Sequence, residues 1–303
     1  MNFKSNAKIN LGLKVLGVVQ DPFGRKLHEL ETVMIPINLY DKITIEESYK
    51  DEIIGMDIPI ESNIMYKALM MIKKIYNIEK CIKIIIEKNI PIFAGLGGGS
   101  GNAASLINAL NEFWNLNMTI EEKVLIGKQI GSDVPFFIYN KPAFVYGTGE
   151  KIKLMDEIIN IKGILIFDDD YCSTKEVFEN VDKSRENNNI NVESTIINNN
   201  SNNIDNSNNI ENSNNIEERN VEYKDIASLS INYVNDLEKG LNSDIYTKIS
   251  AIKKDLIENG AAKALMSGSG GAVFGVYEND KEIEESINKL SKKYRFVYKF
   301  ENI

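Results

Sequence analysis

The stretch IPIFAGLGGGSGNAASLINAL, residues 90–110, places five glycines between Gly95 and Gly101. A strand-like segment precedes the glycines and a helical apolar pattern follows them, so this stretch is not a linker. A glycine turn that opens a helix leaves backbone N–H groups free at the positive end of the helix dipole. The stretch therefore predicts an anion site suited to the phosphates of a nucleotide.

Three known glycine motifs do not fit this stretch. A Walker A loop needs Lys followed by Ser or Thr after the glycines, and neither pair is present. A dinucleotide fingerprint fails at its third glycine position, which is Ser100. A protein-kinase loop would lie between two strands, whereas this stretch leads into a helical pattern. A structural turn that needs positive φ stays open as an alternative, although a second glycine cluster, SGSGGAVFG (267–275), favours a phosphate-bearing ligand or one loop for each ligand.

Length and composition indicate a soluble globular chain with about two domains of ordinary size. The chain has 303 residues, 43% hydrophobic and 26% charged, and a net charge of -9 without a dense basic stripe, which argues against nucleic-acid binding. No apolar run approaches the ~20 residues of a membrane span, and the N-terminus lacks the pattern of a signal peptide. We therefore expect a cytoplasmic protein without a membrane partner. Cys81 and Cys172 are too few for a disulfide framework.

Strand and helix patterns are mixed along the chain and predict two α/β or α+β lobes with a cleft between them, divided somewhere near 145–165. Helix starts are indicated by Ser62 or Asn63 and by a capping box from Thr119 to Glu122. Strands are expected at 7–17, 28–47 (two segments around Pro36), 81–90 and 163–170. Helices are expected at 61–77, 103–114, 119–131, 173–181 and within 224–258. A glycine loop leading into a strand is expected at 264–277, followed by a helix and a strand near 280–300.

A low-complexity segment interrupts the second half of the chain. Between Asn187 and Asn215, asparagine fills 15 of 29 positions. Such a composition cannot bury enough apolar surface to offset the entropy of ordering the chain. We predict a disordered insertion over about 184–220 that has no part in the chemistry.

PIFAGLGGGSGNAA resembles the ATP loop of the GHMP kinases, the family that includes galactokinase, homoserine kinase and mevalonate kinase. Within this family the chain is most similar to the 4-diphosphocytidyl-2-C-methyl-D-erythritol (CDP-methylerythritol) kinases, because six motifs occur in the order expected of them: AKINLGLKVLG, HELETVMIPINLYD, ESNIMYKAL, GLGGGSGNAA, IGSDVPFF and MSGSGGAVFG. The resemblance implies a ribosomal-protein-S5-domain-2-like N-terminal lobe, 1–155, and a ferredoxin-like C-terminal lobe, 156–303.

The implied activity is transfer of phosphate from ATP to the 2-hydroxyl of CDP-methylerythritol in the non-mevalonate pathway to isoprenoids, with Mg²⁺ expected beside ATP. Asp133 would be the base and Lys8 would lie beside it. The sequence shows no dedicated carboxylate cage for a metal ion. The protein would be a monomer or homodimer with a small-molecule substrate. The predicted ATP-binding residues are Asn63, Lys88, Pro91, Gly95, Leu96, Gly97, Gly98, Gly99, Ser100, Gly101 and Asn102, and the predicted substrate-binding residues are Asn10, His28, Thr174, Phe178, Gly268 and Gly270.

Some of these residues have plainer interpretations when the resemblance is set aside. Lys8 would be a solvated strand residue, and Asp133 would be the N-cap of a helix that starts at VPFF. Asn10, two residues after Lys8, shares its strand face, so it could meet the substrate hydroxyls. In the family His28 would hydrogen-bond cytosine, and Phe178 would stack on it.

The chain also departs from the family pattern. Leu27 stands where a stacking Tyr is usual, which removes one aromatic face unless Phe23 folds back to supply it. In the glycine loop, Phe93 stands where a Gly is usual and Gly101 where a second Ser is usual. The altered segment before the histidine motivates one alternative, a GHMP kinase for a different alcohol. A non-catalytic nucleotide-binding protein on the same scaffold is the other.

Overall fold

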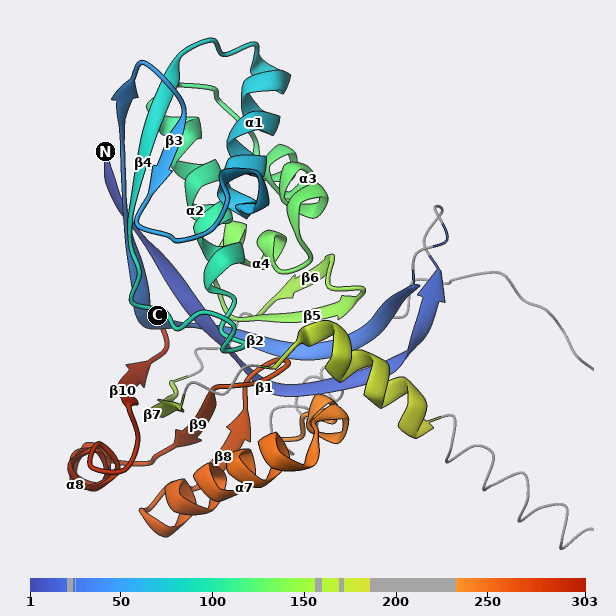
Figure 1. Cartoon of the computed structure of the whole chain (residues 1–303), viewed down its shortest axis with the longest axis vertical. Helices are drawn as coiled ribbons and strands as arrows, with labels where there is room; N and C mark the ends of the chain where they lie inside the picture. The colour runs from blue at the N-terminus through green and yellow to red at the C-terminus, as the bar shows by residue number, and fades with distance from the viewer. Residues whose placement is uncertain (21–23, 25, 156–159, 169–171, 186–232) are drawn as a thin grey trace, which may run out of the picture.

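The computed structural model describes residues 1–20, 24, 26–155, 160–168, 172–185 and 233–303. Helices and strands are mixed through these residues, which confirms the predicted α+β class (Figure 1). The strands are β1 (Asn2–Gln20), β2 (Lys26–Ser48), β3 (Glu52–Ile54), β4 (Cys81–Glu87), β5 (Ala143–Gly147), β6 (Lys151–Leu154), β7 (Lys162–Phe167), β8 (Lys263–Met266), β9 (Val273–Val276) and β10 (Phe296–Glu301). The helices are η1 (Ile60–Ser62), α1 (Ile64–Tyr76), α2 (Gly98–Phe113), α3 (Ile120–Ile130), α4 (Val134–Tyr139), η2 (Asp236–Gly240), α7 (Ser243–Glu258), α8 (Asp280–Leu290) and an unlabelled helix over 174–185.

Two sheets organise the described residues. In the first, six strands lie in the order β3-β4-β2-β5-β6, with β1 also paired to β2; in the second, four strands lie in the order β10-β7-β9-β8. Helices α1 to α4 cover one side of the first sheet, and α7 lies along the second sheet (Figure 1). β1 and β2 form one long antiparallel pair that runs from Asn2 opposite Thr44 to Gln20 opposite Lys26. His28 pairs with Val18 and therefore lies near the end of this pair where β2 begins.

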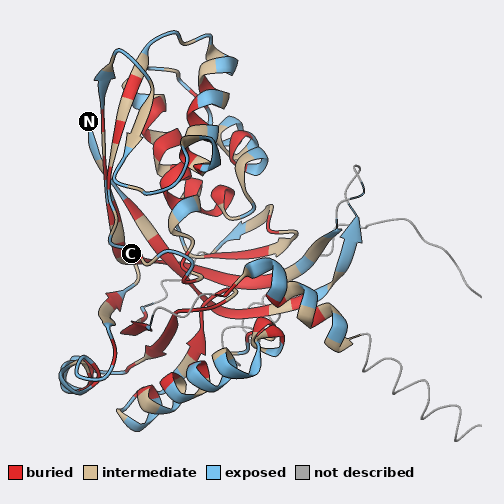
Figure 2. Ribbon diagram, viewed as in Figure 1, coloured by how far each residue is buried: buried red, intermediate tan, exposed pale blue. Residues whose placement is uncertain are grey.

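Three apolar clusters hold these layers together, and Figure 2 shows the buried residues concentrated along the sheets and the helix faces that touch them. One packs α1 and α2 on the first sheet, and another packs α7 and α8 on the second. The third joins the two sheets directly, with Ile35 and Phe144 from the first and Leu165 and Phe274 from the second. This cluster contains residues of both sheets, so it does not mark a boundary between two lobes. The predicted boundary between the lobes at 155/156 therefore stays a prediction.

Local sequence signals explain several boundaries. The side chain of Asn63 accepts from the N–H of Met65 and caps α1, and the predicted capping box of Thr119 and Glu122 is present at the start of α3. The prediction of two strands around Pro36 was wrong, because β2 is continuous through it. Pro36 lies between the part of β2 that pairs with β5 and the part that pairs with β4, so its missing N–H removes no bond on that side.

The second half of the chain differs from the expectation in two places. Residues 236–240 form a 3-10 turn, and α7 begins only at Ser243, after the N-cap Asn242. The second glycine cluster was expected only to lead into a strand. It also follows one, because it connects the antiparallel strands β8 and β9. The predicted disordered insertion lies outside the described residues from position 186 onward, as does Phe23. No helix of the described part of the chain is long and apolar enough to cross a membrane.

Candidate active site

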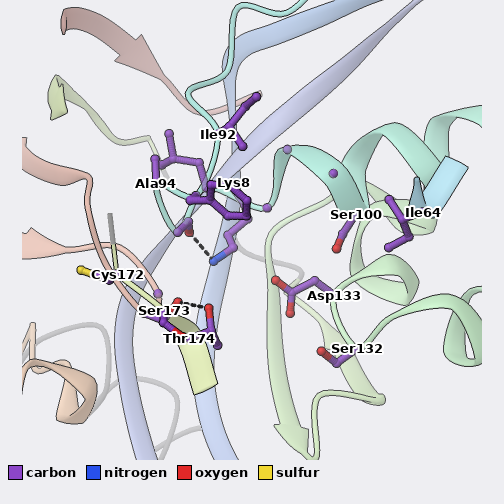
Figure 3. A pocket seen from close by; sticks show the side chains of 18 of the residues that line it. Lys8, Ile64, Ile92, Ala94, Ser100, Ser132, Asp133, Cys172, Ser173 and Thr174 are labelled. Carbon is purple, nitrogen blue, oxygen red and sulfur yellow. Dashed lines mark hydrogen bonds between the residues drawn. The ribbon is translucent and has the colours of Figure 1, made fainter. Parts of the chain in front are cut away.

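A cavity of about 1130 Å³ gathers most of the predicted site residues. Its walls come from β1, β2, the start of α1, the loop into α2, Asp133, the helix over 174–185 and the loop between β8 and β9, so segments far apart in sequence meet here (Figure 3). The predicted residues that line it are Lys8, Asn10, His28, Asn63, Lys88, Pro91, Gly95, Leu96, Gly97, Gly98, Gly99, Ser100, Asn102, Asp133, Thr174, Phe178 and Gly268.

The other two predicted residues, Gly101 and Gly270, support the cavity without lining it. A Cβ built on Gly101 would lie 2.8 Å from the carbonyl oxygen of Asn6, so this glycine lets α2 approach β1. A Cβ built on Gly270 would lie 2.8 Å from the sulfur of Cys172. Both glycines are thus required by close packing in this structure.

The first glycine loop ends as the N-terminus of α2. Gly97 is the N-cap, in the left-handed conformation with φ of 69°, and the first helical bond is donated by the N–H of Gly101 to the oxygen of Gly97. The N–H groups of residues 98–100 precede that bond and stand at the positive end of a 16-residue helix. This is the geometry that binds phosphate at a helix start.

The two glycine loops lie against each other. The N–H of Ala272 donates to the oxygen of Ala94 at 3.0 Å, and a Cβ on Gly95 would lie 2.0 Å from the oxygen of Ser267. Asn235 holds the second loop from behind, because its side-chain amide donates to the carbonyl oxygens of Met266 and Gly268 at 3.0 and 2.7 Å. The second loop therefore buttresses the first and contributes Gly268 to the cavity.

Lys8 is buried, with 3% of its surface exposed, so the interpretation as a solvated strand residue was wrong. Its ammonium donates to the side-chain oxygen of Asn10 at 2.5 Å and to the carbonyl of Gly95 at 2.8 Å. Burial lowers the pKa of Lys8 below its usual 10.5, and the negative charge of Asp133 acts in the opposite direction. Two of the three N–H donors of the Lys8 ammonium are thus engaged, which leaves the third to donate to a group in the cavity.

Asp133 precedes α4 at the N-cap position, but its side chain makes no capping hydrogen bond. The carboxylate instead lines the cavity, and Figure 3 shows it on the side facing Lys8, with the hydroxyl of Ser100 nearby. A buried ammonium and a carboxylate thus face one space beside a helix N-terminus. Such a pair can hold a hydroxyl group and a phosphate group close to each other.

Asn102 and Lys88 differ in how their polar groups are used. Asn102 is 1% exposed, and neither the nitrogen nor the oxygen of its side-chain amide has a hydrogen-bond partner. An unpaired buried amide is costly, so this cavity-lining group calls for a ligand or water. The ammonium of Lys88 pairs with the fully buried carboxylate of Asp41, which also accepts from the N–H groups of Asn89 and Ile90.

At the other end of the cavity, His28 is enclosed by the helix over 174–185. Its ring stacks on Phe178 with centroids 4.4 Å apart, and its Nε2 lies 3.1 Å from both carboxylate oxygens of Asp182. The hydroxyls of Thr174 and Ser269 lie 2.7 Å apart and join this helix to the second glycine loop. Leu27 also lines the cavity.

Sequence reasoning missed four polar residues that build or support this site: Asp182, Asn235 and Ser269, and also Thr32, which accepts a hydrogen bond from the side chain of Asn10. Asp182 lies one helical turn after Phe178, a spacing that could have indicated it. Thr32 and Asn235 carried no signal in the sequence, because their partners are distant in the chain.

Two family models match the chain: GHMP kinases N terminal domain over residues 63–141, and GHMP kinases C terminal over residues 223–295. A 4-diphosphocytidyl-2-C-methyl-D-erythritol kinase of Clostridioides difficile (strain 630) is 38% identical, over 98% of this chain and 94% of that protein. The protein of the same name from Clostridium tetani (strain Massachusetts / E88) is 33% identical, over 98% of each chain.

Solved structures show the same fold at lower identity. A crystal structure of 4-(cytidine 5'-diphospho)-2C-methyl-D-erythritol kinase aligns with a TM-score of 0.73 and 22% identity, covering 100% of this chain and 99% of the other. The mevalonate kinase of Methanococcus jannaschii aligns with a TM-score of 0.65 and 17% identity, covering 100% and 98%. These structures support the predicted two-lobed arrangement of the fold.

Proposed function

Because the chain belongs to the GHMP kinase family, and nearly full-length relatives in that family are CDP-methylerythritol kinases, we propose that it transfers the γ-phosphoryl group of ATP to the 2-hydroxyl of CDP-methylerythritol. This is the phosphorylation step of the non-mevalonate route to isoprenoid precursors. The observation that carries the proposal is the meeting of Lys8 and Asp133 at the N-terminus of α2.

The glycine loop is the proposed seat of the ATP phosphates. The free N–H groups at residues 98–100 would donate to phosphate oxygens, and the orphaned amide of Asn102 supports a ligand at this end of the cavity. Mg²⁺ takes oxygen ligands and usually binds through phosphates plus one or two carboxylates. No group of three or more His, Cys, Asp or Glu side chains that could hold a metal ion occurs in the described residues, so the phosphates would supply most of its ligands, and the Ser100 hydroxyl is the protein donor we assign to it. The ion would neutralise phosphate charge.

The residues of this chain supply positioning and electrostatic stabilisation. Asp133 is the proposed base, which accepts the proton of the substrate hydroxyl or orients that hydroxyl toward the γ-phosphorus. The third N–H of Lys8 would donate to the phosphoryl oxygens, where charge grows as the transfer proceeds. Burial strengthens this interaction because little water screens it.

The cytidine diphosphate part of the substrate would occupy the opposite end of the cavity. Thr174 and Gly268 also line the cavity and suit the diphosphate, and His28 and Phe178 offer polar and aromatic groups for the base. Stacking of a base on an aromatic side chain contributes about 1–3 kcal/mol. Leu27 supplies only an apolar contact where an aromatic ring was expected.

Substrate turnover tests this proposal. Purified protein should release ADP from ATP when CDP-methylerythritol is added, and should do so much more slowly with mevalonate, homoserine or galactose. Turnover of one of those alcohols in preference to the cytidine substrate would favour the alternative that Leu27 suggests, a kinase for a different alcohol. ATP binding without turnover of any alcohol would instead favour a non-catalytic protein.

A further inference from the structure

A chain of buried hydrogen bonds leads from Lys8 away from the cavity. The ammonium of Lys8 donates to Oδ1 of Asn10 at 2.5 Å, and Nδ2 of Asn10 donates to Oγ1 of Thr32 at 2.8 Å. Oγ1 of Thr32 in turn donates to the carbonyl oxygen of Gly12 at 2.7 Å. Thr32 is fully buried and does not line the cavity.

The direction of each hydrogen bond in this series is fixed by the last acceptor, the carbonyl oxygen of Gly12. A backbone carbonyl can only accept, so the single hydroxyl proton of Thr32 is used on Gly12. Thr32 can then only accept from its other neighbour, which must be the NH₂ group of Asn10. The oxygen of the Asn10 amide is consequently the atom that faces Lys8.

An irregularity in the β1–β2 pair creates this arrangement. Asn10 pairs with Met34 and Gly12 with Val33, so Leu11 is an extra residue on β1. Thr32 is paired with Leu13, one position past the bulge. Bulges of this kind redirect backbone groups and often occur beside active sites.

We propose that Thr32 is a positioning residue, which holds the amide of Asn10 in the orientation that places its oxygen against the ammonium of Lys8. The proposal rests on the proposed function, in which Lys8 acts on the transferred phosphoryl group. Without the Thr32 hydroxyl, the Asn10 amide is free to turn over. Its buried NH₂ group would have lost its acceptor, and the amide oxygen would no longer be fixed where it holds the ammonium of Lys8 in its working position.

The test compares Thr32→Val, which keeps the shape but removes the hydroxyl, with Thr32→Ser, which keeps the hydroxyl. We expect kcat to fall about tenfold or more in Thr32→Val and to stay within about threefold of the wild type in Thr32→Ser, the size expected for a lost hydrogen bond to a charged network. The KM for ATP should change by less than about twofold, since the glycine loop is unaltered.

Thr44→Val is the matched control. Thr44 lies on the same strand and donates an exposed hydrogen bond to Asn2, far from the cavity, so its loss should leave kcat unchanged. Combining Thr32→Val with Asn10→Ala then tests whether Thr32 acts through Asn10. In that background Thr32→Val should add less than about a twofold loss.

A second measurement does not depend on activity. Hydrogen exchange of the Asn10 side-chain amide, followed by NMR, should be slow in the wild type and in Thr32→Ser and fast in Thr32→Val. Wild-type kcat in Thr32→Val, an equal loss in the Asn10→Ala background, or unchanged exchange would each overturn the proposal. If the wild type does not turn over CDP-methylerythritol, the proposed function fails, whereas the exchange measurement still decides the orientation of the amide.

Discussion

The two ends of the cavity are built in different ways. The glycine-loop wall, residues 94–102, is one continuous piece of chain whose binding groups are mostly backbone N–H groups at a helix start. The His28 wall consists of His28 from β2 with Phe178 and Asp182 from a helix about 150 residues later, and its groups are side chains held by one another. A wall of contiguous backbone depends on glycines and packing, whereas a wall of distant side chains depends on each partner being present.

The largest expected effect lies between the two walls, at Asp133. Asp133→Asn should lower kcat by about 10²–10⁴-fold, the usual contribution of a general base, because the amide cannot accept the proton. The affinity for ATP should be retained, since the glycine-loop wall is unchanged. Steady-state ADP release and calorimetric titration with a non-hydrolysable ATP analogue measure the two quantities. Ser132→Ala, beside it in the cavity, is the control, and a wild-type rate in Asp133→Asn would remove Asp133 from the mechanism.

The next largest effect tests whether the glycine-loop wall depends on packing. Gly95→Ala places a Cβ 2.0 Å from the oxygen of Ser267 at a φ of 75°, so we expect the melting temperature to fall by roughly 10 °C. Gly99→Ala is the matched change, because its Cβ would meet nothing closer than 3.7 Å. That variant should melt at or slightly above the wild-type temperature, since Ala favours a helix over Gly by up to about 1 kcal/mol. Equal melting temperatures in the two variants would contradict this account.

Lys8, which donates to the carbonyl of Gly95 in the glycine-loop wall, should make turnover sensitive to alkaline pH. The protonated form of Lys8 is the working form, so kcat falls about tenfold for each pH unit above the pKa of this group. Because burial lowers that pKa, and the charge of Asp133 opposes the shift only in part, the fall should begin below 10.5. A pH profile of kcat at saturating substrate measures it. Arg in place of Lys8 keeps its charge, so any alkaline fall that persists in an active Lys8→Arg variant must come from another group.

A smaller effect is expected at the His28 wall. Asp182→Ala leaves His28 without its carboxylate partner, so the KM for the cytidine substrate should rise about tenfold while the KM for ATP stays unchanged. Glu179→Ala, on the same helix and in an exposed ion pair with Lys175 at 3.9 Å, is the control. If the KM for ATP rose equally, the two walls would not be independent.

The smallest effect is expected at the rim of the same wall. Lys26 lies 3.8 Å from Asp182, but its side chain is 64% exposed. Exposed ion pairs contribute about 0–1 kcal/mol, so Lys26→Ala should change the KM of the cytidine substrate by no more than about twofold. A change as large as that of Asp182→Ala would mean that Lys26 contacts the substrate itself.

The same contrast explains what could be predicted from sequence. The helix start at the glycine loop, the Asn63 cap and the Thr119 capping box were confirmed because each is a pattern of neighbouring residues. The burial of Lys8 was missed from its strand alone, because the loop that covers it begins more than 80 residues later.

The remaining errors have the same physical origin. Pro36 reads locally as a strand break, and only the change of partner strand along β2 shows why it is tolerated. Asp133 has the right type and place for an N-cap, yet its carboxylate faces the cavity. Asp182 and Thr32 matter through partners that no local pattern specifies.

The contact between the two glycine loops bears on how members of this family can be recombined. Ala94 and Ala272 meet through main-chain atoms, and Gly95 faces the main chain of Ser267. Any two parents that keep these small residues present the same surfaces there, so a chimera joined between the loops inherits an intact junction. The pair of His28 and Asp182 lies 154 residues apart in sequence. A hybrid enzyme that takes these two residues from different parents should therefore lose its substrate preference before it loses the ability to fold.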